Sequence, residues 1–422
     1  MIEDRWRIVG GKPLEGTVGP AGSKNGALPV LAATLLLDGE TTLHNVPRIA
    51  DTDTMMELLR AFGLVVEATD DGEVRIVNRG LATHVAPAEL VQRMRASHYL
   101  LGPVISRMGR AELPLPGGCD IGDRPVDYII EGLEALGARA TCEPDRIGAE
   151  ASRLRGAAVA LNPAYRSPGA TFNLLMAAAT AEGRTVIENA SFEPDVVSFC
   201  QLLNAAGARI SGIGQPTLTV DGVAGLHGVA HRVNSDRLEA GTFLLAAAAT
   251  RGSVLVSDVT KADLAAAADK LVEAGVQLDP EDGGLRASCP RRPRAVAVVT
   301  EPFPGFPTDL QPMLTALLAC AEGTSTVTES IFDRRLQSAE QLNRMGASVR
   351  LLDSRSASVH GVAELHGAHI EAHNIRDGAA LVIAALAARG ESTVSGRQFV
   401  ARGYQDFEGK LRALGANIEL AG

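Results

Sequence analysis

The stretch Leu133-Glu134-Ala135-Leu136-Gly137 ends an apolar, helix-like run at a glycine, and an extended run follows it. The same arrangement recurs at intervals of about 70 residues along the chain. The glycines that close these runs are Gly63, Gly137, Gly207, Gly275, Gly346 and Gly415. A second series keeps the same spacing, at Gly39, Gly109, Gly183, Gly252, Gly323 and Gly390. The repetition predicts one βα unit built six times.

Each repeat is predicted to run strand, helix, strand, helix, strand, with the glycine after the helix in the left-handed conformation. A chain of 422 residues is long for one core, and three plus three units is the simplest partition. We therefore expect an α/β protein of two lobes. One lobe comprises residues 24–234, and the other comprises residues 1–23 with residues 235–422, because the first strand is expected to join the second lobe.

Bulk properties exclude several classes of function. The net charge of −10 gives no general attraction for nucleic acid. The longest apolar runs, such as residues 378–386, are too short to span a bilayer, and no secretory leader opens the chain. The cysteines lack metal-ligand spacing and are expected to be free thiols in a cytoplasmic protein. They are Cys119, Cys142, Cys200, Cys289 and Cys320.

Several segments depart from the repeat and carry unusual residues. Gly22-Ser23-Lys24-Asn25-Gly26 places a lysine at an expected helix start, where backbone N–H groups favour an anion. A glycine-rich segment, residues 115–127, contains Cys119 and could lie against a ligand. The other departures are Met94-Arg95-Ala96-Ser97, Pro304-Gly305-Phe306-Pro307-Thr308-Asp309, and the arginines Arg335, Arg376 and Arg402. Each segment alone is a weak signal.

Taken together, these segments resemble the enolpyruvyl transferases in order and spacing. The matching motifs are Ser23-Lys24-Asn25, residues 115–127 with Cys119 and Arg124, Phe306-Pro307-Thr308-Asp309, and Arg402-Gly403-Tyr404. The resemblance covers nearly the whole chain. It implies a two-lobed inside-out α/β barrel with six βαβαββ repeats, three in each lobe.

The resemblance also implies a reaction. Phosphoenolpyruvate carries about three negative charges, so its site needs several cations. The family pattern gives this role to Lys24, Arg124, Arg335, Arg376 and Arg402. Carbon 3 of the enol is protonated, a hydroxyl attacks carbon 2, and loss of phosphate restores the double bond. The reaction needs neither a metal nor an organic cofactor.

Three positions are expected to take part in the chemistry itself. Cys119 matches a proton donor and the target of the epoxide fosfomycin, since neighbouring cations favour a thiolate. Asp309 matches the carboxylate that deprotonates the acceptor hydroxyl, and Lys24 is a catalytic cation. The positions expected to bind the acceptor are Asn25, Arg95, Arg124, Pro125, Val126, Asp127, Tyr128, Ser167, Gly169 and Asp309.

The identity of the acceptor stays open at this stage. The first choice is the 3-hydroxyl of UDP-N-acetylglucosamine, which is the first committed step of peptidoglycan synthesis. The alternative is the 3′-hydroxyl of UMP, in the biosynthesis of peptidyl-nucleoside antibiotics, because Pro168, Arg334, Leu336, Asn374 and Asp377 depart from the pattern of the nucleotide-sugar enzyme. A third reading is an inactive nucleotide-binding paralogue. The oligomeric state is also left open.

Overall fold

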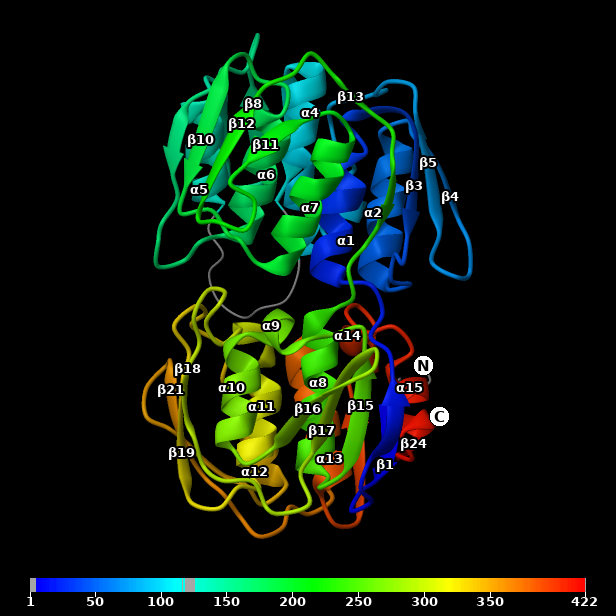
Figure 1. Ribbon diagram of the computed structural model, residues 1–422, viewed down its shortest axis with the longest axis vertical. Coiled ribbons are helices and arrows are strands. Elements are labelled where there is room, and N and C mark those ends of the chain that lie inside the picture. Colours follow the sequence, from blue (N-terminus) through cyan, green and yellow to red (C-terminus); the bar gives the residue numbers. More distant parts are fainter. Residues whose placement is uncertain (1–4, 116, 118–125, 422) are drawn as a thin grey trace. The chain divides into compact units, whose positions relative to one another are not determined.

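The computed structural model describes residues 5–115, 117 and 126–421. The described residues form two compact units, which Figure 1 shows in the colours of the sequence. Unit 1 comprises the described residues up to Ala21 and from Ser235 onward, and unit 2 comprises those from Gly22 to Asn234. Each unit has its own hydrophobic core. No helix in the described part of the chain combines the length and the apolar character needed to cross a membrane.

Unit 1 contains three sheets, each with four strands. The first has the order β22 (His369–Glu371), β23 (Glu391–Ser395), β1 (Arg5–Val9), β24 (Asn417–Ala421). The second has the order β16 (Gln277–Glu281), β17 (Gly284–Ser288), β15 (Ser253–Ser257), β2 (Glu15–Val18). The third has the order β18 (Ala297–Val299), β19 (Thr324–Thr328), β21 (Ser356–His360), β20 (Ser348–Leu351).

Three helices of unit 1 lie in its core and contact one another: α8 (Arg237–Ala249), α11 (Gln311–Leu318) and α13 (Ile375–Ala387). Every residue of α8 and α11 is buried, which fits their Ala- and Leu-rich sequences, because a helix that is apolar all round belongs in a core. A 3-10 turn, η2 (Thr308–Leu310), leads into α11. The remaining helices are α9 (Lys261–Leu264), α10 (Ala266–Glu273), α12 (Ser338–Arg344), α14 (Arg397–Val400) and α15 (Phe407–Ala413).

Unit 2 also contains three sheets. The first has the order β13 (Leu226–His227), β3 (Leu37–His44), β5 (Val74–Asn78), β4 (Val65–Ala68), and β14 (Ala230–Arg232) also pairs with β3. The second has the order β11 (Arg209–Ser211), β12 (Thr217–Asp221), β10 (Arg184–Glu188), β9 (Ala158–Ala160). The third has the order β6 (Arg110–Pro114), β8 (Arg146–Glu150), β7 (Arg139–Cys142).

The helices of unit 2 follow the same plan. The buried ones are α1 (Lys24–Ala33), α6 (Pro168–Ala178) and most of α4 (Leu101–Met108), which continues from the 3-10 turn η1 (Arg95–Leu100). The others are α2 (Ala50–Ala61), α3 (Ala88–Val91), α5 (Asp127–Ala135) and α7 (Pro194–Ala205). Three residues that the sequence analysis singled out lie at or just before the starts of buried helices: Lys24 at α1, Asp309 before α11 and Arg376 at α13.

One strand pattern recurs between the sheets. In the β18–β19–β21–β20 sheet, β18 and β19 are parallel, because a buried helix separates them in sequence, while β19–β21 and β21–β20 are antiparallel. The β9–β10–β12–β11 sheet of unit 2 has the same three pairings. The β6–β8–β7 sheet lacks a full parallel strand, and an isolated bridge between Val85 and Glu112 stands in that position.

The glycines explain why the period is visible in the sequence. All six of the first series have positive φ, between 86° and 102°, as predicted for glycines that follow helices. In the second series, Gly252 differs, because Arg251 has the positive φ of 56° instead. A Cβ on Gly252 would lie 2.0 Å from the carbonyl oxygen of Leu14. Close approach of two backbones, rather than a left-handed conformation, therefore requires the glycine there.

Candidate active site

A carboxylate shared by two buried arginines is the main charged cluster of unit 1. Asp309 lies in η2, and its Oδ1 is 2.6 Å from Nη2 of Arg335, while its Oδ2 is 2.9 Å from Nη2 of Arg376. The side chains of Arg335 and Arg376 are 3% and 5% exposed, whereas that of Asp309 is 25% exposed. Two guanidiniums thus share one carboxylate, and solvent reaches that carboxylate. Such a group can attract an anion and accept a proton.

The start of α13 holds Arg376 in place. Asn374 caps the helix, since its side chain accepts hydrogen bonds from the backbone N–H groups of Arg376 (3.1 Å) and Asp377 (3.0 Å). The guanidinium carbon of Arg376 lies 5.3 Å from the ring centroid of Tyr404, whose hydroxyl is 2.9 Å from that of Thr242. Burial alone would lower the pKa of the Arg376 guanidinium, but Asp309, Tyr404 and Asp236 together outweigh this effect, so the pKa is raised.

A second carboxyl, that of Asp377, lies in the same first turn and is 3% exposed. The side-chain amide of Asn374 donates to its Oδ2 at 2.6 Å. Burial raises the pKa of Asp377 to about 6, although the charge of Arg335 and the hydrogen bond from Asn374 act in the opposite direction. This side chain was noted in the sequence only as a departure from the family pattern, and its burial could not be seen there.

Arg335 reaches Asp309 from the loop that follows β19. Its Nε donates to the carbonyl oxygen of Thr308 at 3.4 Å, and its guanidinium carbon lies 5.9 Å from the ring centroid of Phe332. Arg402 follows α14 and is partly exposed. Arg334, the neighbour of Arg335, is exposed. The structure therefore brings Asp309, Arg335 and Arg376 together.

In unit 2 the corresponding feature is the start of α1. Ser23 caps this helix, since its hydroxyl accepts a hydrogen bond from the N–H group of Gly26 at 3.1 Å. Nζ of Lys24 lies 2.8 Å from Oδ2 of Asp51, with the two side chains 12% and 5% exposed. Asp51 was missed in the sequence, because an aspartate in the first turn of a helix such as α2 is an ordinary N-terminal residue.

Arg95, Ser167 and Gly169 lie at the starts of η1 and α6. Burial lowers the pKa of Arg95. The ring of His98 follows in η1, and its Nδ1 is 2.7 Å from the carbonyl oxygen of Arg95. A Cβ on Gly169 would lie 2.9 Å from Nε2 of His98, so the glycine allows η1 and α6 to approach. Ser167 caps α6 through a 3.2 Å hydrogen bond from the N–H group of Ala170.

The first turn of α5 carries Asp127 and Tyr128, directly after Val126. The hydroxyl of Tyr128 accepts a hydrogen bond from the side-chain amide of Asn162 at 3.3 Å. Its ring centroid lies 6.0 Å from that of Tyr165, so two aromatic rings lie side by side on this surface. Asn25, in the first turn of α1, is partly exposed.

Three predicted site residues, Cys119, Arg124 and Pro125, lie outside the described residues. Their roles stay predictions. Among the other cysteines, burial raises the pKa of Cys200 to about 12 and that of Cys320 to about 11. These two thiols are therefore poor nucleophiles at neutral pH.

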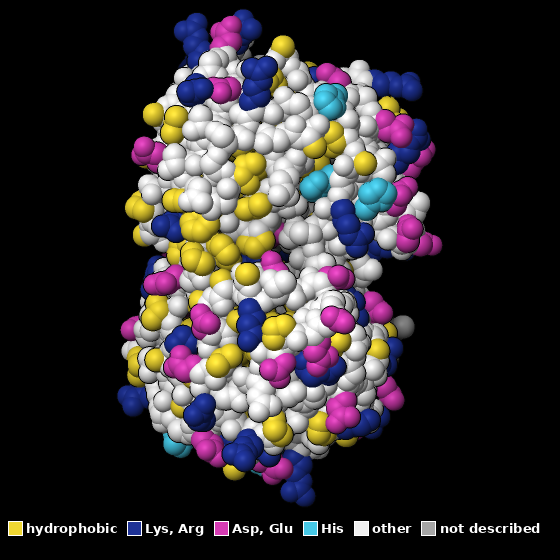
Figure 2. Space-filling view, viewed as in Figure 1, with side chains coloured by type: hydrophobic (Ala, Val, Ile, Leu, Met, Phe, Trp, Pro, Cys, Tyr) yellow, Lys and Arg dark blue, Asp and Glu magenta, His cyan; other side chains and the backbone are white. Residues whose placement is uncertain are grey.

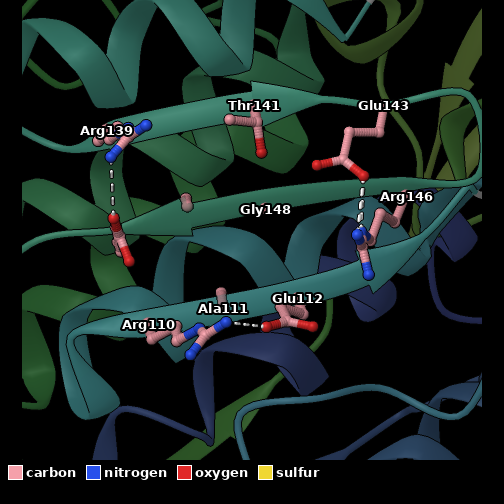
Figure 3. A pocket seen from close by; sticks show the side chains of 10 residues that line it. Arg110, Ala111, Glu112, Arg139, Thr141, Glu143, Arg146 and Gly148 are labelled. Carbon is pink, nitrogen blue, oxygen red and sulfur yellow. Dashed lines mark hydrogen bonds and ion pairs between the residues drawn. The ribbon is translucent and has the colours of Figure 1, made fainter.

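A separate hollow of about 300 Å³ lies on the outer face of the β6–β8–β7 sheet, over Gly148 (Figure 3). Arginines and glutamates line it and pair with each other, as in the 2.8 Å contact between Arg146 and Glu143. None of the predicted site residues lies there. Basic and acidic side chains are also interspersed on the face that Figure 2 shows. Within the described part of the chain, no three His, Cys, Asp or Glu side chains are grouped so that they could hold a metal ion.

Comparison with known proteins identifies the family of the chain. The sequence profile of the family described as EPSP synthase (3-phosphoshikimate 1-carboxyvinyltransferase) matches residues 8–411. UDP-N-acetylglucosamine 1-carboxyvinyltransferase 1 of Caldanaerobacter subterraneus subsp. tengcongensis is 43% identical over 417 residues, which cover 99% of each chain. UDP-N-acetylglucosamine 1-carboxyvinyltransferase 3 of Symbiobacterium thermophilum is 45% identical over 418 residues, which cover 98% of this chain and 97% of the relative.

Solved structures show the same relationship. The enolpyruvyl transferase NikO from Streptomyces tendae has a TM-score of 0.89 and 25% sequence identity, with 100% of both chains covered. An EPSP synthase from Acinetobacter baumannii has a TM-score of 0.75 at 19% identity, with 99% of this chain and 100% of that chain covered, which supports the α/β fold alone. By the profile match over residues 8–411 and by its relatives, the chain belongs to the enolpyruvyl transferase family.

Proposed function

We propose that this protein transfers the enolpyruvyl group of phosphoenolpyruvate to the 3-hydroxyl of UDP-N-acetylglucosamine and releases phosphate, the first committed step of peptidoglycan synthesis. The single observation that carries the proposal is the partly exposed carboxylate of Asp309 between two buried arginines. An alcohol that attacks carbon 2 must lose a proton. Asp309 can accept that proton, and the two guanidiniums can attract the anionic enol. The full-length identity of 43–45% to enzymes named for this reaction supports the choice of acceptor.

The residue roles follow from the reaction. Protonation of carbon 3 gives carbon 2 a positive character, and the acceptor hydroxyl adds to carbon 2 as Asp309 takes its proton. The bond between carbon 2 and the phosphate oxygen then breaks, and carbon 3 loses a proton as the double bond is restored. Cys119 is the proposed proton donor, and Lys24 the proposed catalytic cation. The residues proposed to bind the phosphate and carboxylate are Lys24, Arg124, Arg335, Arg376 and Arg402.

The proposed acceptor site lies at the helix starts of unit 2. The partly exposed Arg95 and the N-terminal ends of α1 and α6 suit the phosphates of a nucleotide, because backbone N–H groups and the helix dipole favour anions there. The ring of Tyr128 suits contact with uracil. The remaining proposed acceptor residues are Asn25, Arg124, Pro125, Val126, Asp127, Ser167, Gly169 and Asp309.

We also propose the finer architecture of the family, in which each unit is an inside-out α/β barrel of three βαβαββ repeats. Two observations support it: the β18–β19–β21–β20 and β9–β10–β12–β11 sheets share one strand pattern, and helices such as α8 and α11 are buried along their whole length. The proposed lobes are residues 24–234 and residues 1–23 with 235–422.

UMP is the second candidate acceptor. The observation that favours it is the altered first turn of α13, where an amide, Asn374, takes the cap position and a carboxyl, Asp377, is buried behind it. The high similarity of the chain to the enolpyruvyl transferase NikO, with a TM-score of 0.89, is compatible with a change of acceptor within one fold.

The test is phosphate release from phosphoenolpyruvate with UDP-N-acetylglucosamine and UMP offered separately. We expect turnover with the sugar nucleotide and little with UMP, because a site built to hydrogen-bond one hydroxyl rejects ligands that lack it by large factors. Turnover with UMP alone would replace the first proposal by the second. Absence of turnover with both would favour the inactive paralogue, and isothermal titration would then show whether either nucleotide binds.

A further inference from the structure

A buried carboxylate, that of Glu329, lies behind the Asp309 cluster in unit 1. Its residue is 0% exposed and follows directly after β19. A buried carboxylate is costly unless its oxygens are fully hydrogen-bonded. Glu329 accepts four hydrogen bonds, from Thr300 Oγ1 at 2.9 Å, Thr308 Oγ1 at 2.8 Å, Ile331 N at 2.8 Å and Phe332 N at 3.1 Å.

These donors come from three different segments. Thr308 directly precedes Asp309, the proposed base. Phe332 belongs to the turn that leads to Arg335 and lies under its guanidinium. Thr300 lies just after β18 and belongs to neither segment. The carboxylate of Glu329 thus joins the segment that carries the base to the segment that carries its cation.

The contacts form a closed network. Glu329 is connected to Asp309 through the hydroxyl of Thr308, and to Arg335 through the turn at Phe332. The 2.6 Å contact between Asp309 and Arg335 completes it. Since η2 is a single 3-10 turn, its own backbone restrains Asp309 little, and the hydroxyl contact supplies a restraint that the turn lacks.

We propose that Glu329 is a positioning residue of the transfer reaction: through the hydroxyl of Thr308 it holds the carboxylate of Asp309 in place against Arg335. The inference rests on the proposed function, which assigns Asp309 as the base. If Glu329 were only structural, substitutions around it would lower turnover only to the extent that they lower the stability of the fold.

Two threonines on the same carboxylate allow these roles to be separated. Thr308 is partly exposed, and no other hydrogen bond of its hydroxyl is found among the described contacts. Thr300 is fully buried, and its hydroxyl also accepts a hydrogen bond from the N–H group of Ser330 at 2.9 Å. Thr300→Val should therefore destabilise the fold more, because it removes two hydrogen bonds at a buried position. Thr308→Val removes the contact that reaches Asp309.

The experiment compares Thr308→Val with Thr300→Val as its matched control, and Thr308→Ser as the rescue. For each purified protein we would measure kcat, KM for phosphoenolpyruvate and for the nucleotide, and the thermal unfolding midpoint. We expect Thr308→Val to lower kcat about 10- to 100-fold with KM values nearly unchanged and little loss of stability, because small misplacements of a reacting group have effects of this size. Thr308→Ser should restore most of the rate.

Thr300→Val should show the opposite behaviour, with the larger loss of stability and the smaller loss of kcat. The inference is overturned if Thr308→Val turns over normally, or if the rate losses of the two variants simply follow their losses of stability. Glu329→Gln, which keeps the shape but adds two N–H donors, should lower kcat more than Thr308→Val does. A wild-type protein that transfers no enolpyruvyl group to either nucleotide would instead overturn the proposed function, and this inference with it.

Discussion

The start of α1 in unit 2 and the start of α13 in unit 1 both carry a cation with little exposure to solvent, but the two cations are held differently. Lys24 is paired with one carboxylate, that of Asp51, at 2.8 Å. Arg376 shares the carboxylate of Asp309 with Arg335. In the first arrangement an ammonium faces a carboxylate, whereas in the second two guanidiniums share one carboxylate.

The difference suggests a division of labour. An ammonium group on a flexible stem can exchange one anionic partner for another, so Lys24 suits a substrate anion that arrives and leaves. The planar guanidiniums of Arg335 and Arg376 are fixed by several contacts each, so they suit a carboxylate that must stay in place. Substitutions at these positions should separate the two roles.

The largest effect is expected for Asp309→Asn. An amide cannot accept the proton of the acceptor hydroxyl, so kcat should fall about 100- to 10,000-fold, which is the usual contribution of a general base. Asp51→Asn is the comparison in unit 2, and it should cost less because Asp51 is proposed to hold the cation Lys24 and not to take a proton itself. Steady-state kinetics of both variants would contradict the division of labour if Asp51→Asn were the more damaging.

A smaller effect is expected for Lys24→Ala. A charge-assisted hydrogen bond to the substrate is worth about 1.5–3 kcal/mol, so turnover should fall by about tenfold or more while the fold persists. Lys12→Ala is the matched control, since Lys12 is exposed and belongs to no cluster described above. Arg402→Ala is expected to behave like Lys24→Ala. Near-normal turnover of Lys24→Ala, with circular dichroism unchanged, would place the substrate elsewhere.

Asp377→Asn should change stability rather than turnover, in a way that depends on pH. The pKa of Asp377 is raised in the fold from 3.8 to about 6, so its protonated form stabilises the protein below about pH 4, and this contribution is lost as the pH rises through 6. Relative to wild type, the variant should gain about 1–3 kcal/mol of stability between pH 4 and pH 8.

Thermal unfolding at several pH values measures this gain. The exposed Asp279 provides the control. For Asp279→Asn, the difference in stability from wild type should stay nearly constant as the pH changes. If the stability difference between Asp377→Asn and wild type did not grow with pH, the carboxyl of Asp377 would be charged over the whole range from pH 4 to pH 8. The first turn of α1 carries no acidic residue, so it has no counterpart of this effect.

The smallest effect is expected for Tyr128→Phe. The ring is kept, and only the 3.3 Å hydrogen bond from Asn162 is lost, so the affinity for a uridine nucleotide should change by less than about tenfold. Tyr128→Ala, which removes the ring, should weaken binding further. Titration calorimetry with UMP would argue against contact with uracil if both variants bound as the wild type does.

Local signals in the sequence predicted much of the fold. Gly63, Gly137 and their equivalents were recognisable because a residue after a helix with positive φ is nearly always glycine. Ser23 was within a motif that the sequence singled out, Ser167 was an expected acceptor-binding position, and both cap buried helices. Gly252 shows the limit, because its glycine is required by the carbonyl of Leu14, which is distant in sequence.

The candidate site was predicted only in part, for a related reason. Lys24, Asp309 and Arg376 were found because they interrupt a repeated pattern with residues of known chemistry. Asp51 and Glu329 were missed, because an aspartate in the first turn of a helix and a glutamate after a strand are ordinary in sequence. Their importance comes from burial and from the partners that surround them.

The sequence by itself determined the period of the chain, the family and the identity of most charged candidates, because these depend on residue types at fixed spacings. Only the tertiary structure decided which charges meet. Asp309 and Arg376 are 67 residues apart in sequence, yet Oδ2 of Asp309 lies 2.9 Å from Nη2 of Arg376. Coulomb and hydrogen-bond energies depend on distance and on exclusion of water, and a linear sequence contains neither.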